Sequence, residues 1–331
     1  MTFDAILLNG VFPTAHNGSA FGFIISLEIN RGARRCPCLS ELLEGNPMRW
    51  TPAGQSQDVE DQRNQTGGGG FRPRGVHVGL GGIVILLLLS WFFKRDFFSL
   101  IDSAPGGDSS ATVSEADPAR NAREEPLVQF TSFVLDDTQN TWRQILPSMG
   151  AQYRTAKLVL FRDAIHSGCG AAEASSGPFY CPEDEKVYID LGFYEELKTR
   201  FGAPGEFAQA YVLAHEVGHH VQKILGVEPR VRQLMRQHPE QAKALSVRME
   251  LQADCLAGVW GHSTANRNIL EPGDVESGLN AAAAGGDDRL QRGSTGRVSP
   301  ESFTHGSSAQ RMEWFKRGLN EGTVKACNTF E

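Results

Sequence analysis

The stretch "YVLAHEVGHHVQKILG", residues 211–226, decides how the rest of this 331-residue chain is interpreted. It contains the pattern His-Glu-x-x-His at His215, Glu216 and His219. On a helix, positions i and i+4 lie on one face about one turn apart, so the two imidazoles can reach the same ion. The pattern is typical of zinc hydrolases, with the glutamate as general base. His220 points about 100° away from His219 and is expected to be structural.

A catalytic zinc ion needs a third protein ligand and an open position. A histidine six residues after the second is one solution, but Leu225 stands there. The stretch "RMELQADCLAGVW", residues 248–260, offers Glu250 and Asp254 instead, again at i and i+4. We predict that Glu250 is the third ligand and that Asp254 accepts the outer N–H of a ligand imidazole. The alternative is an exposed acidic face. Small residues predict that the two helices pack closely: Gly218, Ala253, Ala257 and Gly258.

Hydrophobic periodicity places these helices at the end of an α+β domain, residues 127–331. Residues 127–146 suit an amphipathic helix before Pro147, and three short β-rich segments follow. "CPEDE" between the last two segments resembles a hairpin connection. The order of strands before helices favours an α+β fold, with a small antiparallel sheet followed by the active-site helices, over an alternating parallel sheet. With the His-Glu-x-x-His pattern, the expected class is zincin-like. The predicted strands are 157–161, 177–181 and 186–190, and the predicted helices are 206–225 and 239–262.

The segment "GVHVGLGGIVILLLLSWFF", residues 75–93, carries no formal charge. As a helix it would be about 28 Å long, close to the hydrocarbon thickness of a bilayer, so we predict one transmembrane helix rather than a buried core helix. The expected localisation is the bacterial cytoplasmic (inner) membrane, with the catalytic domain outside the cytoplasm. Residues 1–47 are predicted to be a doubtful extension, with Met48 as the true start. Residues 48–74 are predicted to be a polar disordered lead-in, and residues 94–126 a flexible linker.

Charge and cysteine content narrow the partners and the chemistry. The net charge is −7, and the chain has no basic run interleaved with aromatic residues, so a nucleic-acid partner is not expected. Four cysteines follow residues 75–93, and an even set could form two disulfides in any of three connectivities. We favour the pairs Cys169–Cys181 and Cys255–Cys327, and four reduced thiols are the alternative.

Several longer motifs extend the zinc pattern, and together they resemble the neutral zinc metallopeptidases of bacteria, a family of single-span membrane proteins. These motifs are "VEDQRN", "GPFYCPEDEKVYID", "LAHEVGHHVQ", "ELQADCLAGVW", "GGDDRLQ" and "SFTHGSSAQRMEWF". The resemblance runs from Met48 nearly to the end of the chain and leaves residues 1–47 without a counterpart. It implies one Zn²⁺ ion held by His215, His219 and Glu250, with Glu216 catalytic.

The same resemblance draws attention to His305 in "FTHGSS". Such a site needs a donor for the oxyanion, and His305 either fills that role or is a helix-cap or core histidine. Asp287 and Asp288 are either a second metal site or, as we expect, a helix-terminal acidic pair. The expected function is membrane-anchored hydrolysis of peptide bonds, by attack of a zinc-bound water that Glu216 deprotonates. The alternatives are hydrolysis of another amide, such as a cell-wall peptide, and a non-catalytic zinc-stabilised binding module of the envelope.

Overall fold

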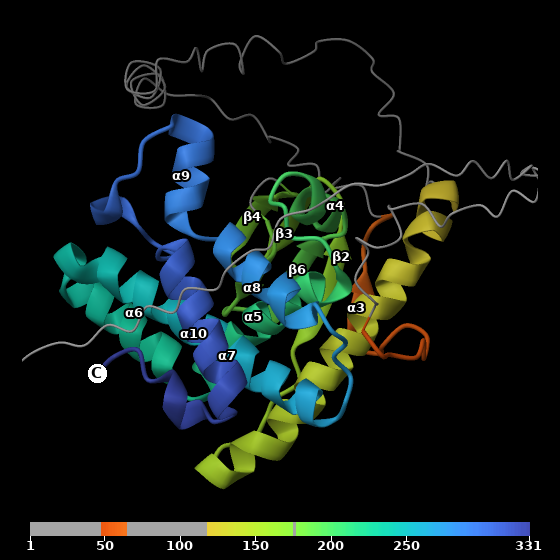
Figure 1. Ribbon diagram of the computed structural model, residues 1–331, viewed down its shortest axis with the longest axis horizontal. Helices are drawn as coiled ribbons and strands as arrows, with labels where there is room; N and C mark the ends of the chain where they lie inside the picture. The colour runs from red at the N-terminus through yellow and green to blue at the C-terminus, as the bar shows by residue number, and fades with distance from the viewer. Residues whose placement is uncertain (1–47, 65–117, 175–176) are drawn as a thin grey trace, which may run out of the picture. The chain divides into compact units, whose positions relative to one another are not determined.

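The computed structural model describes residues 48–64, 118–174 and 177–331, which fold into a mostly helical α+β unit with two small sheets (Figure 1). The α+β class predicted from the sequence is confirmed at this level. All of these residues fall within the unit Glu44–Glu331.

The larger sheet has four strands in the order β1 (Val59–Asp61), β2 (Lys157–Phe161), β6 (Lys186–Asp190) and β5 (Phe179–Cys181). β5 and β6 form the antiparallel hairpin that "CPEDE" predicted. The prediction of an antiparallel sheet is otherwise wrong, because β1, β2 and β6 run parallel. The reason is that "VED" in β1 is too short to show a strand period, and an inserted hairpin, β3 (Ala164–Ser167) and β4 (Gly170–Glu173), separates β2 from β5.

Residues 48–64 belong to the folded unit, although the sequence predicted a disordered lead-in there. Met48 is buried, and the Trp50 ring packs against Phe130 and Phe133 with centroid distances of 5.3 and 5.8 Å. In Figure 1 this orange segment runs beside α3 (Pro118–Ile145). The prediction missed the segment because its few apolar residues pack against helices that are distant in the sequence.

The start of α3 also differs from the prediction, which assigned residues 94–126 to a flexible linker. Residues 118–126 are the first turns of the helix. Ion pairs account for this, since the Glu124 carboxylate accepts from Arg63 at 2.8 Å, Arg120 at 2.8 Å and Arg162 at 2.6 Å. The polar residues here therefore form a helix that ion pairs hold to the folded unit, and not a flexible linker.

The predicted transmembrane helix, residues 75–93, lies outside the described residues, as does the extension 1–47. Within the part of the chain that the structure describes, no helix is both long and apolar enough to cross a bilayer. This finding contradicts the predicted localisation in the bacterial inner membrane. Strand pairing gives a physical reason: a single crossing by residues 75–93 would put residues 48–64 and 118–331 on opposite sides of a bilayer, yet β1 and β2 share one sheet.

From Glu206 onward the regular elements are helical, as predicted. The helix expected at 206–225 is α5 (Glu206–Ile224), which ends before Gly226 at φ +74°. The helix expected at 239–262 begins as a 3₁₀ turn and continues as α7 (Ala242–Asn266). The remaining helical elements are η2 (Leu146–Met149), α4 (Gly192–Thr199), α6 (Val227–Gln237), η4 (Pro239–Gln241), α8 (Asp274–Ala284), α9 (Asp287–Thr295), η5 (Pro300–Ser302), α10 (Ser308–Glu321) and η6 (Val324–Cys327).

Close helix contacts hold α5, α7 and α10 together. A Cβ added at Gly218 would lie 3.0 Å from the Ala253 carbonyl oxygen, so the predicted close approach of α5 and α7 is confirmed there. Gly258 was assigned to the same contact, and this is wrong. It faces α10, where a Cβ would overlap the backbone near Phe315 and Leu319.

Both predicted disulfides form. Cys255–Cys327 joins α7 to η6, with the Cα atoms 5.4 Å apart. Cys169–Cys181 joins the turn between β3 and β4 to the end of β5, with the Cα atoms 5.8 Å apart. The chain is therefore crosslinked once beside the helices and once at the edge of the sheet.

Candidate metal centre

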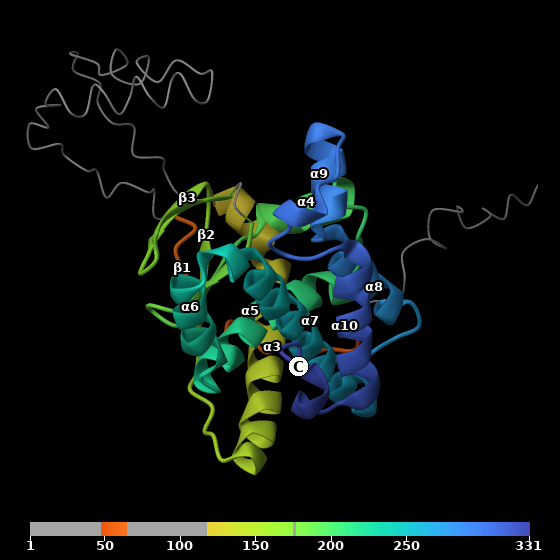
Figure 2. The ribbon, with the colours of Figure 1, turned by 90° about the vertical axis from the view of Figure 1, so that its left-hand side faces the viewer.

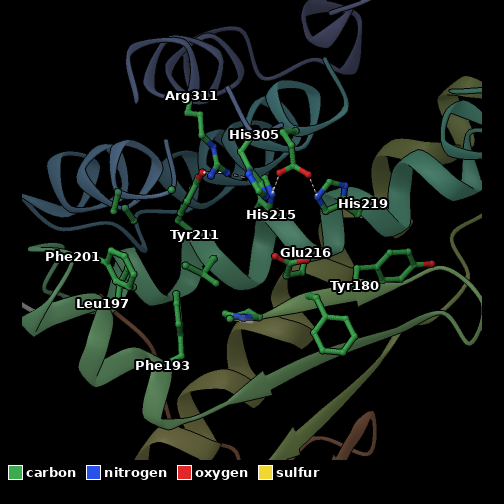
Figure 3. A pocket seen from close by; sticks show the side chains of 18 of the residues that line it. Tyr180, Phe193, Leu197, Phe201, Tyr211, His215, Glu216, His219, His305 and Arg311 are labelled. Carbon is green, nitrogen blue, oxygen red and sulfur yellow. Dashed lines mark hydrogen bonds and ion pairs between the residues drawn. The ribbon is translucent and has the colours of Figure 1, made fainter. Parts of the chain in front are cut away.

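Two imidazole rings and one carboxylate meet between α5 and α7 (Figure 3). His215 Nε2 lies 3.2 Å from one carboxylate oxygen of Glu250, and His219 Nε2 lies 3.6 Å from the other. One candidate ligand atom from each of the three residues lies within 4.8 Å of the others. The i and i+4 spacing on α5 and the close packing at Gly218 bring these groups together from segments about 30 residues apart.

The outer nitrogen of each ring faces a fixed oxygen. His215 Nδ1 lies 2.8 Å from Asp254 Oδ1, and His219 Nδ1 lies 2.8 Å from Gln222 Oε1. A neutral imidazole carries one N–H, so donation from Nδ1 leaves a lone pair on each Nε2. Two lone pairs that face a carboxylate repel it, so positive charge, as a proton on a ring or as a metal cation between the three groups, is favoured there. The donor set, two imidazole nitrogens and a carboxylate, suits Zn²⁺.

The electrostatics of the centre favour positive charge at the same point. Burial opposes protonation of His215, yet the charges of Asp254 and Glu250 raise its pKa to about 10. The pKa of His219 is raised by Glu250 in the same way, against the effect of burial. For Glu250, burial would raise the pKa, but the two histidines hold it well below its ordinary value. The site therefore stabilises a cation shared by two rings and a carboxylate.

Asp254 is fully buried, which rules out the alternative of an exposed acidic face. Its two oxygens accept from Arg311 Nη2 and Nε, both at 2.8 Å, and from the Tyr211 hydroxyl. Burial opposes ionisation, but the Arg311 guanidinium and His215 keep the pKa of Asp254 below its ordinary value. Asp254 is thus a charged acceptor that Arg311 and Tyr211 hold against His215. The sequence prediction included neither Arg311 nor Tyr211.

Gln222 orients the second ring. Its side chain is buried, and its Nε2 donates to the Met249 carbonyl oxygen at 2.8 Å and to Gln252 Oε1 at 3.1 Å. These two bonds fix which end of the amide carries the oxygen, and that oxygen faces His219 Nδ1. The sequence prediction did not include Gln222, because a lone glutamine has no metal-site signature.

We expect the substitution Gln222→Ala to weaken zinc binding by about 10- to 100-fold, because His219 would lose the acceptor that fixes its ring. Competition with a chromogenic chelator measures the affinity. Gln209→Ala, on the same helix but away from the ligands, is the matched control and is expected to bind zinc as the native protein does. Equal affinity of Gln222→Ala and the control would mean that Gln222 does not position His219.

Glu216 lies in an open cleft beside the two rings, as Figure 3 shows. The cleft has a volume of about 620 Å³, and the candidate ligands line it together with Glu216, His305 and Arg311. The Glu216 side chain is largely buried, which raises the pKa of its carboxyl, while the neighbouring histidines oppose that shift. A carboxylate that faces the cleft and is made more basic by burial suits a general base.

His305 lines the same cleft, and its side chain is 48% exposed, so it is not a core histidine. It does not cap α10 either, because Ser307 is the N-cap and forms a capping box with Gln310. Its Nδ1 lies 3.1 Å from Asp287 Oδ1. The other Asp287 oxygen accepts backbone N–H groups of Thr304 and His305, both at 2.6 Å. The sequence prediction missed this support.

The two aspartates at the start of α9 are a helix-terminal pair, as expected. Asp288 accepts from the backbone N–H of Ser308 at 2.7 Å and from its hydroxyl at 2.9 Å. His220 also fits its predicted structural role. It is fully buried, with Nδ1 2.9 Å from the Tyr180 hydroxyl and Nε2 2.6 Å from the Arg154 carbonyl oxygen. Both ring nitrogens are therefore engaged away from the centre.

Comparisons with known proteins give the following relatives. A family model described as "Putative neutral zinc metallopeptidase" matches residues 48–330. The uncharacterized protein YpfJ of Escherichia coli (strain K12) is 50% identical over 289 residues, which cover 86% of this chain and 99% of that protein. The uncharacterized protein Rv2575 of Mycobacterium tuberculosis (strain ATCC 25618 / H37Rv) is 42% identical over 239 residues, 69% of this chain and 77% of that protein. No solved structure matches this chain.

Proposed function

Since this chain belongs to the neutral zinc metallopeptidase family, we propose that it hydrolyses peptide bonds at one zinc ion held by His215, His219 and Glu250. The observation that carries the proposal is the convergence of both Nε2 atoms on the Glu250 carboxylate, beside Glu216 in an open cleft. A structural zinc site tends to be closed by four protein ligands and needs no base. The open side and Glu216 therefore favour catalysis over a binding module.

Zinc bound at this centre would polarise the substrate carbonyl and lower the pKa of a water molecule to about 7. Glu216 would accept a proton from the water that attacks the carbonyl carbon. Its carboxyl then carries the proton within the cleft and donates it to the nitrogen of the departing amine. Burial of Glu216 supports both steps, because a raised pKa makes the carboxylate a stronger base and lets it hold the proton until the C–N bond breaks.

His305 is proposed to donate to the oxyanion that develops on the carbonyl oxygen. Its Nδ1 faces Asp287, so Nε2 is the ring nitrogen left to meet the substrate in the cleft, and an Nε2–H there would donate to the oxyanion. Asp287 also fixes the backbone on both sides of the ring's Cα, which limits how far the ring can move. Removal of the His305 imidazole would leave these backbone hydrogen bonds to Asp287 in place, so a substitution at His305 tests the side chain alone.

We expect His305→Ala to lower kcat by about 10²-fold and to leave zinc affinity unchanged, because one oxyanion donor would be lost. Steady-state kinetics and metal titration measure the two effects. His262→Ala is a control that removes a histidine remote from the cleft, and it is expected to keep kcat. Normal kcat in His305→Ala would remove His305 from the mechanism.

The proposed function is tested with the full-length protein and an unfolded protein as substrate. We expect new amino termini to appear, cleavage to stop when a chelator removes the metal, and about one equivalent of zinc to restore it. Failure to cleave any protein while zinc is bound would contradict a general peptidase. Cleavage of a cell-wall peptide alone would then point to a hydrolase of another amide, since the chemistry depends little on what flanks the carbonyl.

A further inference from the structure

One end of the cleft is apolar. In Figure 3, Phe193, Leu197 and Phe201 gather on the side of His215 away from His219 and Tyr180. The Phe193 and Phe201 rings lie 6.2 Å apart, and both pack against the main core together with the buried Leu197. We call this end, formed by Phe193, Leu197 and Phe201, the apolar pocket; the lining of the cleft also contains the apolar residues Val212, Ala281 and Leu290.

Two charged groups next to the apolar pocket are paired with each other. Glu196 and Arg200 line the cleft on the same side, and they form an ion pair with each other at 3.4 Å. The Arg200 guanidinium also lies over the Phe201 ring, 5.2 Å from its centroid. At the other side of the cleft, Glu228 pairs with Arg232 at 2.6 Å. An ionic side chain placed against Phe193, Leu197 and Phe201 would therefore lose its water without gaining an unpaired opposite charge from Glu196 or Arg200.

Leu290 adds an independent observation. Among the described residues, large apolar side chains with high exposure are Met149, Leu290 and Val298, and of these three only Leu290 lines the cleft. It lies 37% exposed on α9, a short helix that projects from the other helices in both views (Figures 1 and 2). Gly286 and Asp288 fix the start of that helix against Ser308. α9 also approaches the apolar pocket, because Arg289 Nη2 would lie 3.7 Å from a Cβ placed at Gly202, next to Phe201. An exposed leucine in the lining of the cleft offers apolar surface that a bound apolar group would cover.

We propose that the apolar pocket binds a large apolar side chain of the substrate, such as leucine, methionine or phenylalanine, next to the bond that is cleaved. The proposal rests on the proposed peptidase function and narrows it to a substrate class. The pocket borders His215, so a side chain bound there belongs to a residue adjacent to the reacting carbonyl. Burial of such a side chain is worth about 10- to 100-fold in kcat/KM over alanine, aspartate or lysine at that position.

The first experiment identifies the preference. Cleavage sites in an unfolded protein are mapped by mass spectrometry with the native zinc enzyme. Peptides around the main site are then made with phenylalanine, leucine, alanine, aspartate or lysine on either side of the bond. We expect one of the two positions to show the 10- to 100-fold apolar preference. Equal kcat/KM for apolar and charged residues at both positions would overturn the proposal while leaving peptidase activity established.

The second experiment assigns the preference to the pocket. Leu290→Asp changes an exposed residue, so folding is expected to survive, and kcat/KM should fall by about 10-fold for the leucine peptide and little for the alanine peptide. Val298→Asp is the matched control, because Val298 is 38% exposed and does not line the cleft. Equal losses in the two variants, or on both peptides, would argue against the pocket.

A binding measurement keeps the proposal testable without turnover. Zinc-loaded Glu216→Gln protein is titrated with fluorescein-labelled leucine and aspartate peptides, and anisotropy reports Kd. We expect the leucine peptide to bind at least 10-fold more tightly, and Leu290→Asp in the same background to remove most of that difference. Equal Kd values for the leucine and aspartate peptides would overturn the proposal that the apolar pocket binds an apolar side chain. If the leucine peptide bound tightly but the native zinc enzyme cleaved no peptide, the proposed peptidase function would be contradicted and the apolar pocket would not.

Discussion

Replacement of Glu216 by glutamine is expected to lower kcat by about 10²- to 10⁴-fold and to leave zinc affinity within a few-fold of the native value. Glutamine has nearly the same shape and can still hydrogen-bond a water, but it cannot accept a proton. Such a loss corresponds to about 3–5.5 kcal/mol of transition-state stabilisation, since each factor of ten is 1.36 kcal/mol. The residue lies in the cleft beside the proposed ligands without being one of them.

A matched control exists on the same helix. Glu206 occupies the first turn of α5, is half-buried and also has a pKa raised by burial, but its carboxylate accepts from the Trp50 indole and is remote from the cleft. Glu206→Gln should keep kcat within a few-fold. Kinetics and zinc titration on both variants separate catalysis from folding. If Glu216→Gln kept more than a tenth of native kcat, another group would be the base.

The sequence predicted the local part of this site well. The spacing of His215, His219, Glu250 and Asp254 follows from the helix period alone, and the structure brings these side chains together. The sequence also predicted the end of α5 near Gly226 and the β5–β6 hairpin, because glycine and turn residues act locally. Both disulfides were predicted from an even cysteine count and a choice among three connectivities. Roles of the residues in catalysis and metal binding stay predictions.

Long-range contacts were the part that the sequence did not predict. Arg311 lies 57 residues from Asp254 and Gln222 lies 30 from Gln252, and no period relates such pairs. β1 has only three residues and pairs with a strand about 100 residues away. Residues 118–126 were assigned to a linker because composition alone cannot show that Glu124 meets three arginines. In each case a polar or very short segment is ordered by a distant partner.

Substitution of Arg311 by methionine is expected to destabilise the metal-free protein by about 3–5 kcal/mol. Arg311 is 6% exposed, and its guanidinium makes two 2.8 Å bonds to a carboxylate that is fully buried. Methionine fills a similar volume but leaves the Asp254 charge without its partner. Urea unfolding in excess chelator measures the effect on the protein alone, because bound zinc would add its own stabilisation. Asp254 would have to take up a proton, and its hold on His215 Nδ1 would weaken.

Two further variants decide whether the loss comes from an unpaired buried charge. Arg317→Met makes the same change on the exposed face of α10, where a cation–π contact with Trp314 is lost, and should cost at most about 1 kcal/mol. Asp254→Asn combined with Arg311→Met removes both charges, so it should be more stable than Arg311→Met alone. If the double variant were instead less stable, packing around Arg311 would dominate. Such a result would not support the charge of Asp254 as the feature that fixes the tautomer of His215.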